Sequence, residues 1–490
     1  MFETAEVGNH LEKSDYKRQE PKLRTALLEA QRALAGSNFS LVLIIGGVEG
    51  AGKTEFTNQL LEWLDARGLA VHAWGAPTDE ERKRPFFWRF WRILPPKSKA
   101  AILLTSWYSE PIVGRVFKET GQAELDQRLD QVVEFERMLV AEGVLLVKLW
   151  LHISKSEQRR RFEKLEADPD ARWRVTKQDW KFHKRYDKFR EVCEHALMKT
   201  STGEAPWHIV EATDRRYRNL TAARIVLDSL ERRVEESRTA AKPEHKPDHP
   251  KPKVNNVIRK LDLGLKLDAD VFDKKLEKLQ NRIGTLTRCL SKKERSLILA
   301  FEGPDAAGKG GAIRRLTQAM DARLFRVDSV AAPTDEEKAR PYLWRFWRDL
   351  PRVGRVTLYD RSWYGRVLVE RVEGFAAAQE WRRAYAEINA FEEQLAESGI
   401  IVRKFWIALS ADEQLKRFKD RQGTPYKQYK ITEEDWRNRA KWDAYEAAAC
   451  EMIERTSTEH APWILVEGND KRWARIKILE SVVEALESGL

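Results

Sequence analysis

The chain has 490 residues, of which 42% are hydrophobic and 34% are charged. At roughly 150 residues per domain, this length excludes a single small domain and predicts at least two compact ones. Lysine and arginine outnumber aspartate and glutamate by 88 to 77, and the net charge of +11 favours a polyanionic partner over an acidic surface, unless it serves solubility alone.

Cysteine spacing and apolar runs exclude several further classes. Cys193, Cys289 and Cys450 lie far apart without CxxC or Cys/His spacing, which argues against a disulfide framework and a structural zinc site. The first twenty residues hold no apolar run typical of a signal peptide, and the run at 41–45 is far shorter than the ~18 residues of a membrane helix. We therefore expect a cytoplasmic protein that does not enter a membrane.

An internal repeat organises the chain. The segment PTDEERKRPFFWRFWRILP at 77–95 returns as PTDEEKARPYLWRFWRDLP at 333–351, an offset of 256 positions. The same offset holds without a gap over the rest of the repeat, where it aligns Gly47 with Gly303, Ser106 with Ser362 and Trp207 with Trp463. A period of this length predicts two domains of one type.

The segment between the repeats differs in composition. Residues 237–256 read SRTAAKPEHKPDHPKPKVNN, in which four prolines alternate with charges. Such a segment has little to bury and predicts an extended linker. The sequence thus predicts an N-terminal domain over 1–236, a linker over 237–256 and a C-terminal domain over 257–490.

Each predicted domain opens with a helix and then alternates buried strands with helices. In the first repeat we expect a helix at 21–35 and strands at 41–45, 100–105, 144–153 and 207–212; in the second, a helix at 269–290 and strands at 297–301, 355–360, 400–409 and 463–468. Continuous apolar strands between helices predict an α/β fold in which a parallel sheet is covered on both faces. In such sheets a ligand binds at the carboxyl ends of the strands.

A glycine loop follows the first strand of each repeat. Such loops surround phosphate with backbone N–H groups at a helix N-terminus, and a lysine adds charge. The first loop matches the full GxxxxGK[ST] pattern with Gly47, Gly52, Lys53 and Thr54. The second has Gly303, Gly308 and Lys309 but Gly310 in place of the hydroxyl residue. On the loops alone, the first repeat would be the better enzyme.

The metal-binding positions reverse that order. A phosphoryl transferase needs a carboxylate to hold Mg²⁺, usually at the end of a neighbouring buried strand. The second repeat has Asp360 there, followed by Arg361, whereas the first has Leu104 and Thr105. Asp305 offers a second carboxylate inside the second loop.

Two more cationic positions are lost from the first repeat. Arg421 aligns with Leu165, and Lys427 aligns with Ala171. The sequence therefore predicts a catalytic C-terminal domain beside a non-catalytic N-terminal domain. The first loop either still binds phosphate through Lys53 or is vestigial, in a domain that serves as a packing partner for the second.

Three motifs of the second repeat resemble the polyphosphate kinase 2 family: GPDAAGKGG at 303–311, YDRSWYGRVLVERVEGF at 359–375 and KDRQGTPYKQYKITEEDW at 419–436. The doubled architecture resembles its class II, the two-domain polyphosphate:AMP phosphotransferases. The resemblance implies two tandem P-loop kinase domains with a thymidylate-kinase-like fold and a helical lid. It also implies Mg²⁺-dependent transfer of a terminal phosphoryl group from inorganic polyphosphate to AMP, giving ADP, in the second domain.

The resemblance also implies roles for individual residues. Asp305 and Asp360 hold Mg²⁺, Lys309 holds the terminal phosphates, and Arg361 neutralises the transferring group. Four lid positions meet polyphosphate, and these are Arg417, Arg421, Lys427 and Lys430. Relatives of this class often associate, so a homo-oligomer is an option, but the sequence marks no interface.

Two groups of residues keep alternative interpretations. Arg366, Glu370 and Arg371 either hold the phosphate and sugar of AMP or form ion pairs on a solvated helix face. The WRFWR segments at 88–92 and 344–348 occur in both repeats, so we favour aromatic packing beside arginine stems, with Arg345 and Arg348 as alternative phosphate contacts.

Two other functions compete with the polyphosphate reaction. One is an ATP-dependent nucleoside monophosphate kinase, and the other is a non-enzymatic polyanion-binding protein built on an inactive kinase fold. The intact Asp360 speaks against the second, and no nucleic-acid partner is expected.

Overall fold

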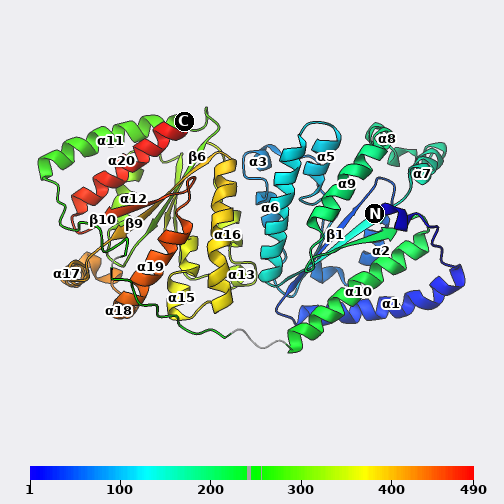
Figure 1. The fold of residues 1–490 in the computed structure, drawn as a ribbon, viewed down its shortest axis with the longest axis horizontal. Coiled ribbons are helices and arrows are strands. Elements are labelled where there is room, and N and C mark those ends of the chain that lie inside the picture. The colour runs from blue at the N-terminus through cyan, green and yellow to red at the C-terminus, as the bar shows by residue number, and fades with distance from the viewer. Residues whose placement is uncertain (240–243, 255) are drawn as a thin grey trace. The chain divides into compact units, whose positions relative to one another are not determined.

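The computed structural model describes residues 1–239, 244–254 and 256–490, without the side chains of Lys427 and Lys430 (Figure 1). The predicted linker therefore falls partly outside the described residues, at 240–243 and 255. The chain divides into two compact units, one of Met1–Pro77, Arg89–Ala241 and Pro333–Arg345 and the other of Thr78–Trp88, Lys242–Ala332 and Phe346–Leu490.

The first unit is built on a five-stranded parallel sheet with the strand order β2-β3-β1-β4-β5. Its strands are β1 (Ser40–Gly47), β2 (Leu69–His72), β3 (Ala100–Leu103), β4 (Val144–His152) and β5 (Trp207–Glu211). The central strand β1 is almost wholly buried, as expected for a strand covered on both faces.

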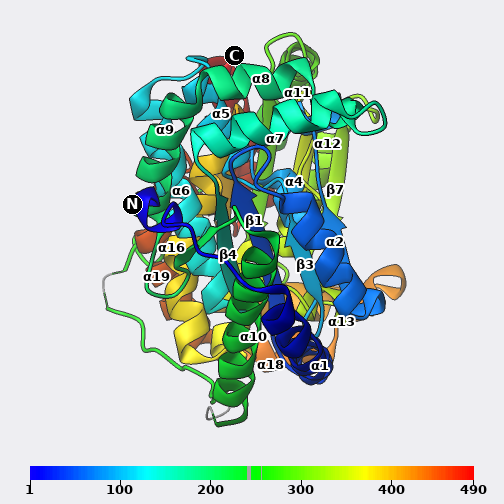
Figure 2. The same cartoon turned by 90° about the vertical axis from the view of Figure 1, so that its right-hand side faces the viewer.

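Helices cover both faces of this sheet (Figures 1 and 2). On one face α10 packs against β4 and β5, with α1 beside it and α2 against β1, and on the other face lie α5, α6 and α9. These helices are α1 (Lys13–Ala35), α2 (Lys53–Trp63), α5 (Ser109–Val116), α6 (Gln122–Ala141), α9 (Tyr186–Thr200) and α10 (Arg215–Thr239). The remaining helices of the repeat are α3 (Asp79–Arg82), α4 (Trp88–Trp91), α7 (Lys155–Ala167) and α8 (Lys177–Lys184), with the 3-10 turns η1 (Phe2–Ala5), η2 (Ala66–Gly68) and η3 (Arg172–Arg174).

The second unit repeats this architecture, with the equivalent parallel order β7-β8-β6-β9-β10. Its strands are β6 (Ser296–Glu302), β7 (Phe325–Ser329), β8 (Val356–Asp360), β9 (Ile400–Ala408) and β10 (Trp463–Glu467). In the register of the sheet Phe301 of β6 pairs with Asp360 of β8 and Phe405 of β9. The residues that follow β6 and β8 therefore meet at one edge of the sheet.

The helices of the second unit also form two layers (Figure 1). One layer contains α11 (Ala269–Cys289), α12 (Lys309–Gln318) and α20 (Lys471–Gly489), and the other contains α15 (Val369–Glu373), α16 (Ala378–Glu397) and α19 (Trp442–Thr456). Helices α17 (Ala411–Gln422) and α18 (Glu433–Ala440), joined by η5 (Pro425–Lys430), form the predicted helical lid segment. The short elements of the second repeat are α13 (Asp335–Lys338), α14 (Trp344–Arg348) and η4 (Trp363–Arg366).

The structure confirms the predicted α/β fold and its buried strands. It adds β2 and β7, which the sequence did not reveal because both are short edge strands with half of their positions or more exposed. Helix α1 begins at Lys13, earlier than predicted, and runs through Pro21. Helix α10 extends to Thr239, which is beyond the predicted start of the linker.

A buried ion pair occurs in both sheets in the same form. In the second unit Lys404 is fully buried, and its Nζ donates to Glu392 Oε2 at 2.6 Å and to the Thr456 carbonyl at 2.6 Å. In the first unit Lys148 donates to Glu136 Oε2 at 2.6 Å and to the Thr200 carbonyl at 2.8 Å. Because both repeats keep this arrangement, we assign it to the fold and not to the chemistry of one site.

No helix in the described part of the chain is both long and apolar enough to cross a lipid bilayer.

Candidate active site

The second glycine loop lies at the carboxyl edge of its sheet, between β6 and α12. Gly303 has a φ of +142°, and a Cβ there would lie 2.6 Å from the Ile407 carbonyl oxygen, so a larger residue would push the loop off β9. Helix α12 begins at Lys309, directly after Gly308. The loop amides and the helix N-terminus thus form the anion-binding arrangement that the sequence predicts.

Lys309 holds the loop in its present shape. Its Nζ donates to the Gly303 carbonyl at 2.7 Å and to the Pro304 carbonyl at 3.3 Å. Its residue surface is 9% exposed, and burial, together with the nearby Arg361, lowers the pKa of the ammonium group. A buried cation beside the loop is well placed to attract phosphate oxygens.

Asp305 and Arg361 form an ion pair across the loop, with Arg361 Nη2 donating to Asp305 Oδ1 at 2.7 Å. Burial alone would raise the pKa of Asp305, but Lys309 and Arg361 hold that pKa below its usual value. The backbone of Arg361 adopts a φ of +63°, a left-handed conformation that costs a non-glycine residue about 1–2 kcal/mol. The end of β8 is therefore strained in a way that directs Arg361 to the loop.

Asp360 lies opposite Gly310. A Cβ on Gly310 would lie 3.9 Å from Asp360 Oδ2, so the glycine leaves open the space that a serine or threonine side chain would occupy. None of the described residues donates a hydrogen bond to the Asp360 carboxylate through a side chain. Both oxygens are thus available as acceptors at the edge of the loop.

Glu302 is a residue that the sequence reasoning missed. It is the last residue of β6 and is buried, and Ser362 Oγ donates to its Oε1 at 2.8 Å. Burial raises the pKa of this carboxyl group. The first repeat has Gly46 at the same position, so a comparison of the repeats at the fixed offset could have revealed it.

Arg417 lies beneath the loop. Its guanidinium group donates to the carbonyls of Ala306 and Ala307, at 3.0 Å each, and to that of Gly468 at 2.7 Å, and it is 4% exposed. Arg161 makes the equivalent bonds in the first repeat. Arg417 thus fastens the second loop as Arg161 fastens the first, and its predicted contact with polyphosphate stays a prediction.

The other lid positions lie on α17 and η5. Arg421 is half-buried in the last turn of α17. The backbones of Lys427 and Lys430 belong to η5, but their side chains lie outside the described residues. Their predicted contact with polyphosphate stays a prediction.

The residues considered for AMP binding are already engaged within the protein. Arg371 is 4% exposed and donates to Asp248 Oδ2 at 2.7 Å, to Glu451 Oε2 at 2.8 Å and to the Tyr385 hydroxyl at 2.9 Å. This favours a structural role, in which Arg371 fastens the segment containing Asp248 to α15. Arg366 pairs with Glu370 at 3.1 Å and has Glu380 within 3.7 Å, so the ion pairs of the second interpretation are present, but its side chain is 14% exposed and the helix face is not a solvated one.

The aromatic residues of the WRFWR segments are buried in both repeats, in agreement with the packing interpretation. Arg345 pairs with Glu337 at 3.4 Å, and Arg348 pairs with Asp349 at 2.9 Å.

The first glycine loop has a different charge environment. Lys53 Nζ donates to the Gly47 carbonyl at 3.0 Å and to Glu49 Oε1 at 3.2 Å. The buried Arg218 donates to the Ala51 carbonyl at 3.2 Å, and its guanidinium group fills the space beside Gly52. Ala474 occupies the position of Arg218 in the second repeat. The first loop, although it matches the full motif, thus has its lysine paired with a carboxylate of the same loop. Thr54, its hydroxyl residue, is exposed.

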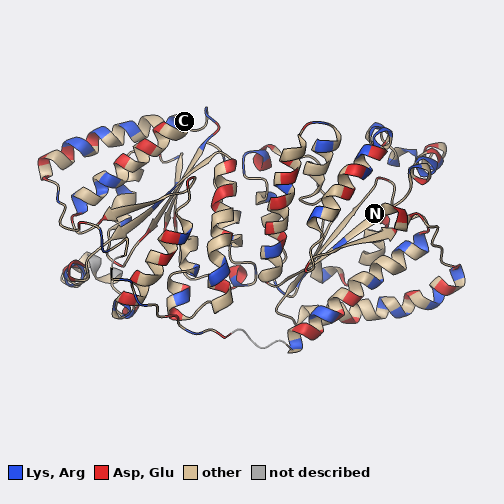
Figure 3. Ribbon diagram, in the orientation of Figure 1, with Lys and Arg blue, Asp and Glu red and all other residues tan. Residues whose placement is uncertain are grey.

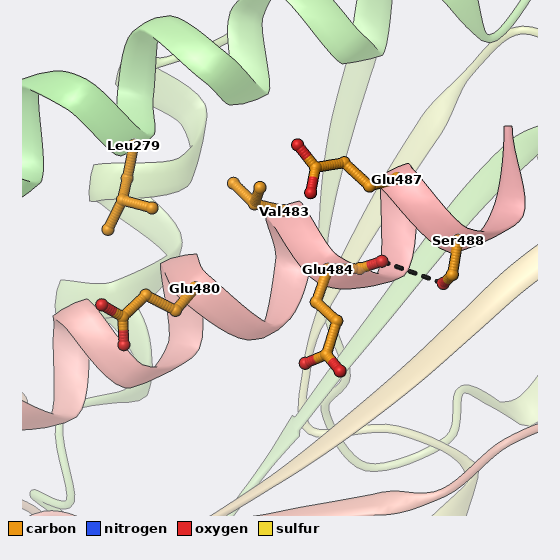
Figure 4. A pocket seen from close by; sticks show the side chains of 6 residues that line it. All are labelled: Leu279, Glu480, Val483, Glu484, Glu487 and Ser488. Atoms are coloured by element: carbon orange, nitrogen blue, oxygen red, sulfur yellow. Dashed lines mark hydrogen bonds between the residues drawn. The ribbon is translucent and has the colours of Figure 1, made fainter.

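A surface hollow between α11 and α20 lies away from the loop (Figure 4). Its lining includes Glu480, Glu484 and Glu487 and no lysine or arginine, which does not suit a phosphate chain. The hollow lies at the opposite edge of the sheet, because Gly489, at the end of α20, packs on Ile401 at the start of β9.

The described residues include no group of three acidic, histidine or cysteine side chains close enough to hold a metal ion alone. A cation at Asp305 and Asp360 would need phosphate oxygens and water as its other ligands, which is the usual arrangement for Mg²⁺.

Comparison with known proteins agrees with this geometry. The family model for polyphosphate kinase 2 matches residues 10–238 and again residues 266–489. The chain is 49% identical to a polyphosphate:AMP phosphotransferase of Pseudomonas aeruginosa, with 100% of this chain and 99% of the relative covered. It is 46% identical to a polyphosphate:AMP phosphotransferase of Pseudomonas syringae pv. tomato, again with 100% and 99% covered.

A solved structure is similar over the same extent. The crystal structure assigned as a polyphosphate kinase 2 from Pseudomonas aeruginosa PA01 aligns with a TM-score of 0.90 at 48% identity, covering 100% of this chain and 99% of that one. The two repeats, their glycine loops and the full-length similarity lead to one conclusion. The chain belongs to the polyphosphate kinase 2 family.

Proposed function

We propose that this protein transfers the terminal phosphoryl group of inorganic polyphosphate to AMP, giving ADP, and that the reaction takes place in the C-terminal repeat. One observation supports this location above the others. Asp305, Asp360 and Arg361 converge on the second glycine loop, whereas the first repeat has Glu49, Leu104 and Thr105 at those positions. Full-length relatives with the same two repeats are named for this reaction.

Phosphoryl transfer through a loose transition state depends mainly on positioning and charge neutralisation. The loop amides and Lys309 would hold the terminal phosphates of the donor. Arg361, released from Asp305 or shared with it, would neutralise the transferring group. The phosphate of AMP is already an anionic nucleophile, so the site needs no strong general base.

Mg²⁺ is part of this proposal. Asp360, beside Gly310, and Asp305 would hold the ion directly or through water. When bound, the ion would offset the negative charge that two phosphate-bearing substrates bring together. Its remaining ligands would come from the substrates and water.

Surface charge does not by itself select the donor. Lysine and arginine are interspersed with aspartate and glutamate on the helices of both units (Figure 3). The preference for polyphosphate over ATP therefore rests on the family and on the names of the full-length relatives.

The direct test is to incubate the protein with AMP and either polyphosphate or ATP, with Mg²⁺ or with excess EDTA, and to measure ADP by chromatography. We expect ADP from polyphosphate in the presence of Mg²⁺ and almost none with EDTA. An Asp360→Asn preparation, purified in parallel, reports contaminating adenylate kinase in the ATP arm. If the wild type forms ADP above this background from AMP and ATP, but not from AMP and polyphosphate, the proposed donor is overturned.

A further inference from the structure

A chain of hydrogen bonds joins the second glycine loop to the helical lid segment. Asn438 on α18 donates through Nδ2 to Asp305 Oδ2 at 3.0 Å. Asn438 Oδ1 lies 3.1 Å from the Tyr445 hydroxyl on α19, and that hydroxyl lies 3.2 Å from Glu373 Oε1 at the end of α15. These hydrogen bonds, here called the polar chain, therefore connect the loop with three helices that lie together in the second unit (Figure 1).

Glu373, at the other end of the polar chain, is held by ion pairs. The Glu373 side chain is 5% exposed, and its Oε2 accepts from Lys441 Nζ at 2.8 Å, with Arg437 Nε at 3.4 Å. Burial raises the pKa of Tyr445, and the negative charge of Glu373 raises it further, so the Tyr445 hydroxyl stays protonated. Its single proton can be donated to Glu373 Oε1 or to Asn438 Oδ1, and a bond to Oδ1 leaves the Asn438 NH₂ group directed towards Asp305.

The first repeat contains phenylalanine at all three positions of this chain. Phe117, Phe182 and Phe189 align with Glu373, Asn438 and Tyr445. The rings of Phe117 and Phe182 are 5.1 Å apart, those of Phe182 and Phe189 are 5.8 Å apart, and both pairs meet edge to face. The same backbone elements thus pack with three aromatic rings in place of three polar groups.

This replacement separates the needs of the fold from those of the site. If the polar chain existed to hold the helices together, the first repeat would need it too, yet its α5, α8 and α9 pack without it. The retained features, such as the Lys148 and Lys404 pairs, identify what the fold requires. All three polar positions differ together in the repeat that lacks the Asp360 carboxylate.

The orientation of the loop carboxylate differs accordingly. Asp305 accepts from Asn438 and Arg361, and Lys309 donates to loop carbonyls. In the first repeat Phe182 takes the place of Asn438 and offers no hydrogen bond. The loop carboxylate there, Glu49, pairs with Lys53 at 3.2 Å. In the second repeat the loop carboxylate thus bonds to an amide on the lid helix and to Arg361, and in the first repeat it bonds to the loop lysine.

We propose that Glu373, Tyr445 and Asn438 are positioning residues that orient the Asp305 carboxylate for phosphoryl transfer. This inference rests on the proposed function of the C-terminal repeat. It predicts that the polar chain acts as a unit, so the Tyr445 hydroxyl matters only through Asn438.

The test compares Tyr445→Phe, Asn438→Ala and the double variant in the full-length protein. Tyr445→Phe removes one oxygen atom and should lower kcat by about tenfold with little change in KM, because the lost bond orients a charged group. In the Asn438→Ala background the same change should have almost no further effect. A purely structural role for Tyr445 would instead give effects that add.

Two further variants sharpen the comparison. The triple change Glu373→Phe, Asn438→Phe and Tyr445→Phe installs the residues of the first repeat and should abolish most ADP formation while the protein stays folded. Phe189→Tyr makes the opposite single-atom change in the first repeat and should leave activity unchanged. Full activity in Tyr445→Phe or in the triple variant would overturn the inference.

Hydrogen exchange tests the same inference without substrate. Exchange of the loop amides at 303–309 should quicken in Asn438→Ala and stay unchanged in Phe189→Tyr, because only the first removes a bond to the loop. If only the proposed function is wrong, the wild type will make no ADP, but loop exchange will still be faster in Asn438→Ala than in the wild type. Equal exchange in all three proteins would count against the positioning role even if the enzyme is active.

Discussion

Replacing Asp360 with asparagine is expected to lower the rate of ADP formation from polyphosphate and AMP by about 10³-fold or more. The change keeps the size of the side chain and removes its negative charge. None of the described side chains donates a hydrogen bond to this carboxylate, so its loss should leave the surrounding structure intact. Initial rates measured at saturating Mg²⁺, with circular dichroism to verify the fold, provide the test.

The first repeat supplies a matched control for this variant. Leu104 is the counterpart of Asp360, and Leu104→Asn should leave the rate unchanged. A rate for Asp360→Asn within tenfold of the wild type would refute the assignment of Asp360 to the metal.

Replacing Lys404 with methionine is expected to destabilise the second unit by about 3–5 kcal/mol, because it leaves the Glu392 charge buried without its partner. Both side chains are fully buried. Burial lowers the pKa of Lys404 and raises that of Glu392, and their close contact opposes both shifts. Urea unfolding followed by tryptophan fluorescence would measure the loss.

The mechanism of this loss can be separated from a simple packing defect. Adding Glu392→Gln to Lys404→Met removes the unpaired charge but keeps a side chain that can accept from Trp363 and Tyr364. The double variant should therefore be more stable than Lys404→Met alone. If it is less stable, the buried charge is not the dominant cost.

Much of the fold was predictable from the sequence because the central strands are continuous apolar runs. Strands β1, β4, β6 and β9 are of this kind, and the fixed offset between the repeats doubled the evidence for each. The edge strands β2 and β7 were not predicted, since their half-exposed positions lack that pattern. Their place in the sheet depends on tertiary pairing with β3 and β8.

The candidate site was predictable where its residues follow a strand or lie within the loop. Asp305, Lys309 and Asp360 are of this kind. The sequence could not show that Arg417 and Arg371 bond to carbonyls and carboxylates of the protein itself. An arginine in a sequence gives no sign of whether its partner is another residue or a substrate. Only the folded structure reveals the partner.

The polar chain was missed for a related reason. Glu373 lies inside the motif at 359–375, but Asn438 and Tyr445 follow more than 60 residues later and outside the quoted motifs, so no motif connects the three. Their signal was nevertheless present in the alignment of the repeats, where all three change to phenylalanine. Differences between duplicated domains are therefore as informative as the motifs that they share.

The central claim is that one repeat performs the chemistry and the other, despite its better loop motif, does not. The most direct measurement compares Lys309→Met with Lys53→Met in the reaction of polyphosphate with AMP, using the same preparation and assay. We predict that Lys309→Met lowers the rate by about 10²-fold or more, whereas Lys53→Met leaves it unchanged. Equal losses in the two variants, or a larger loss in Lys53→Met, would contradict the account.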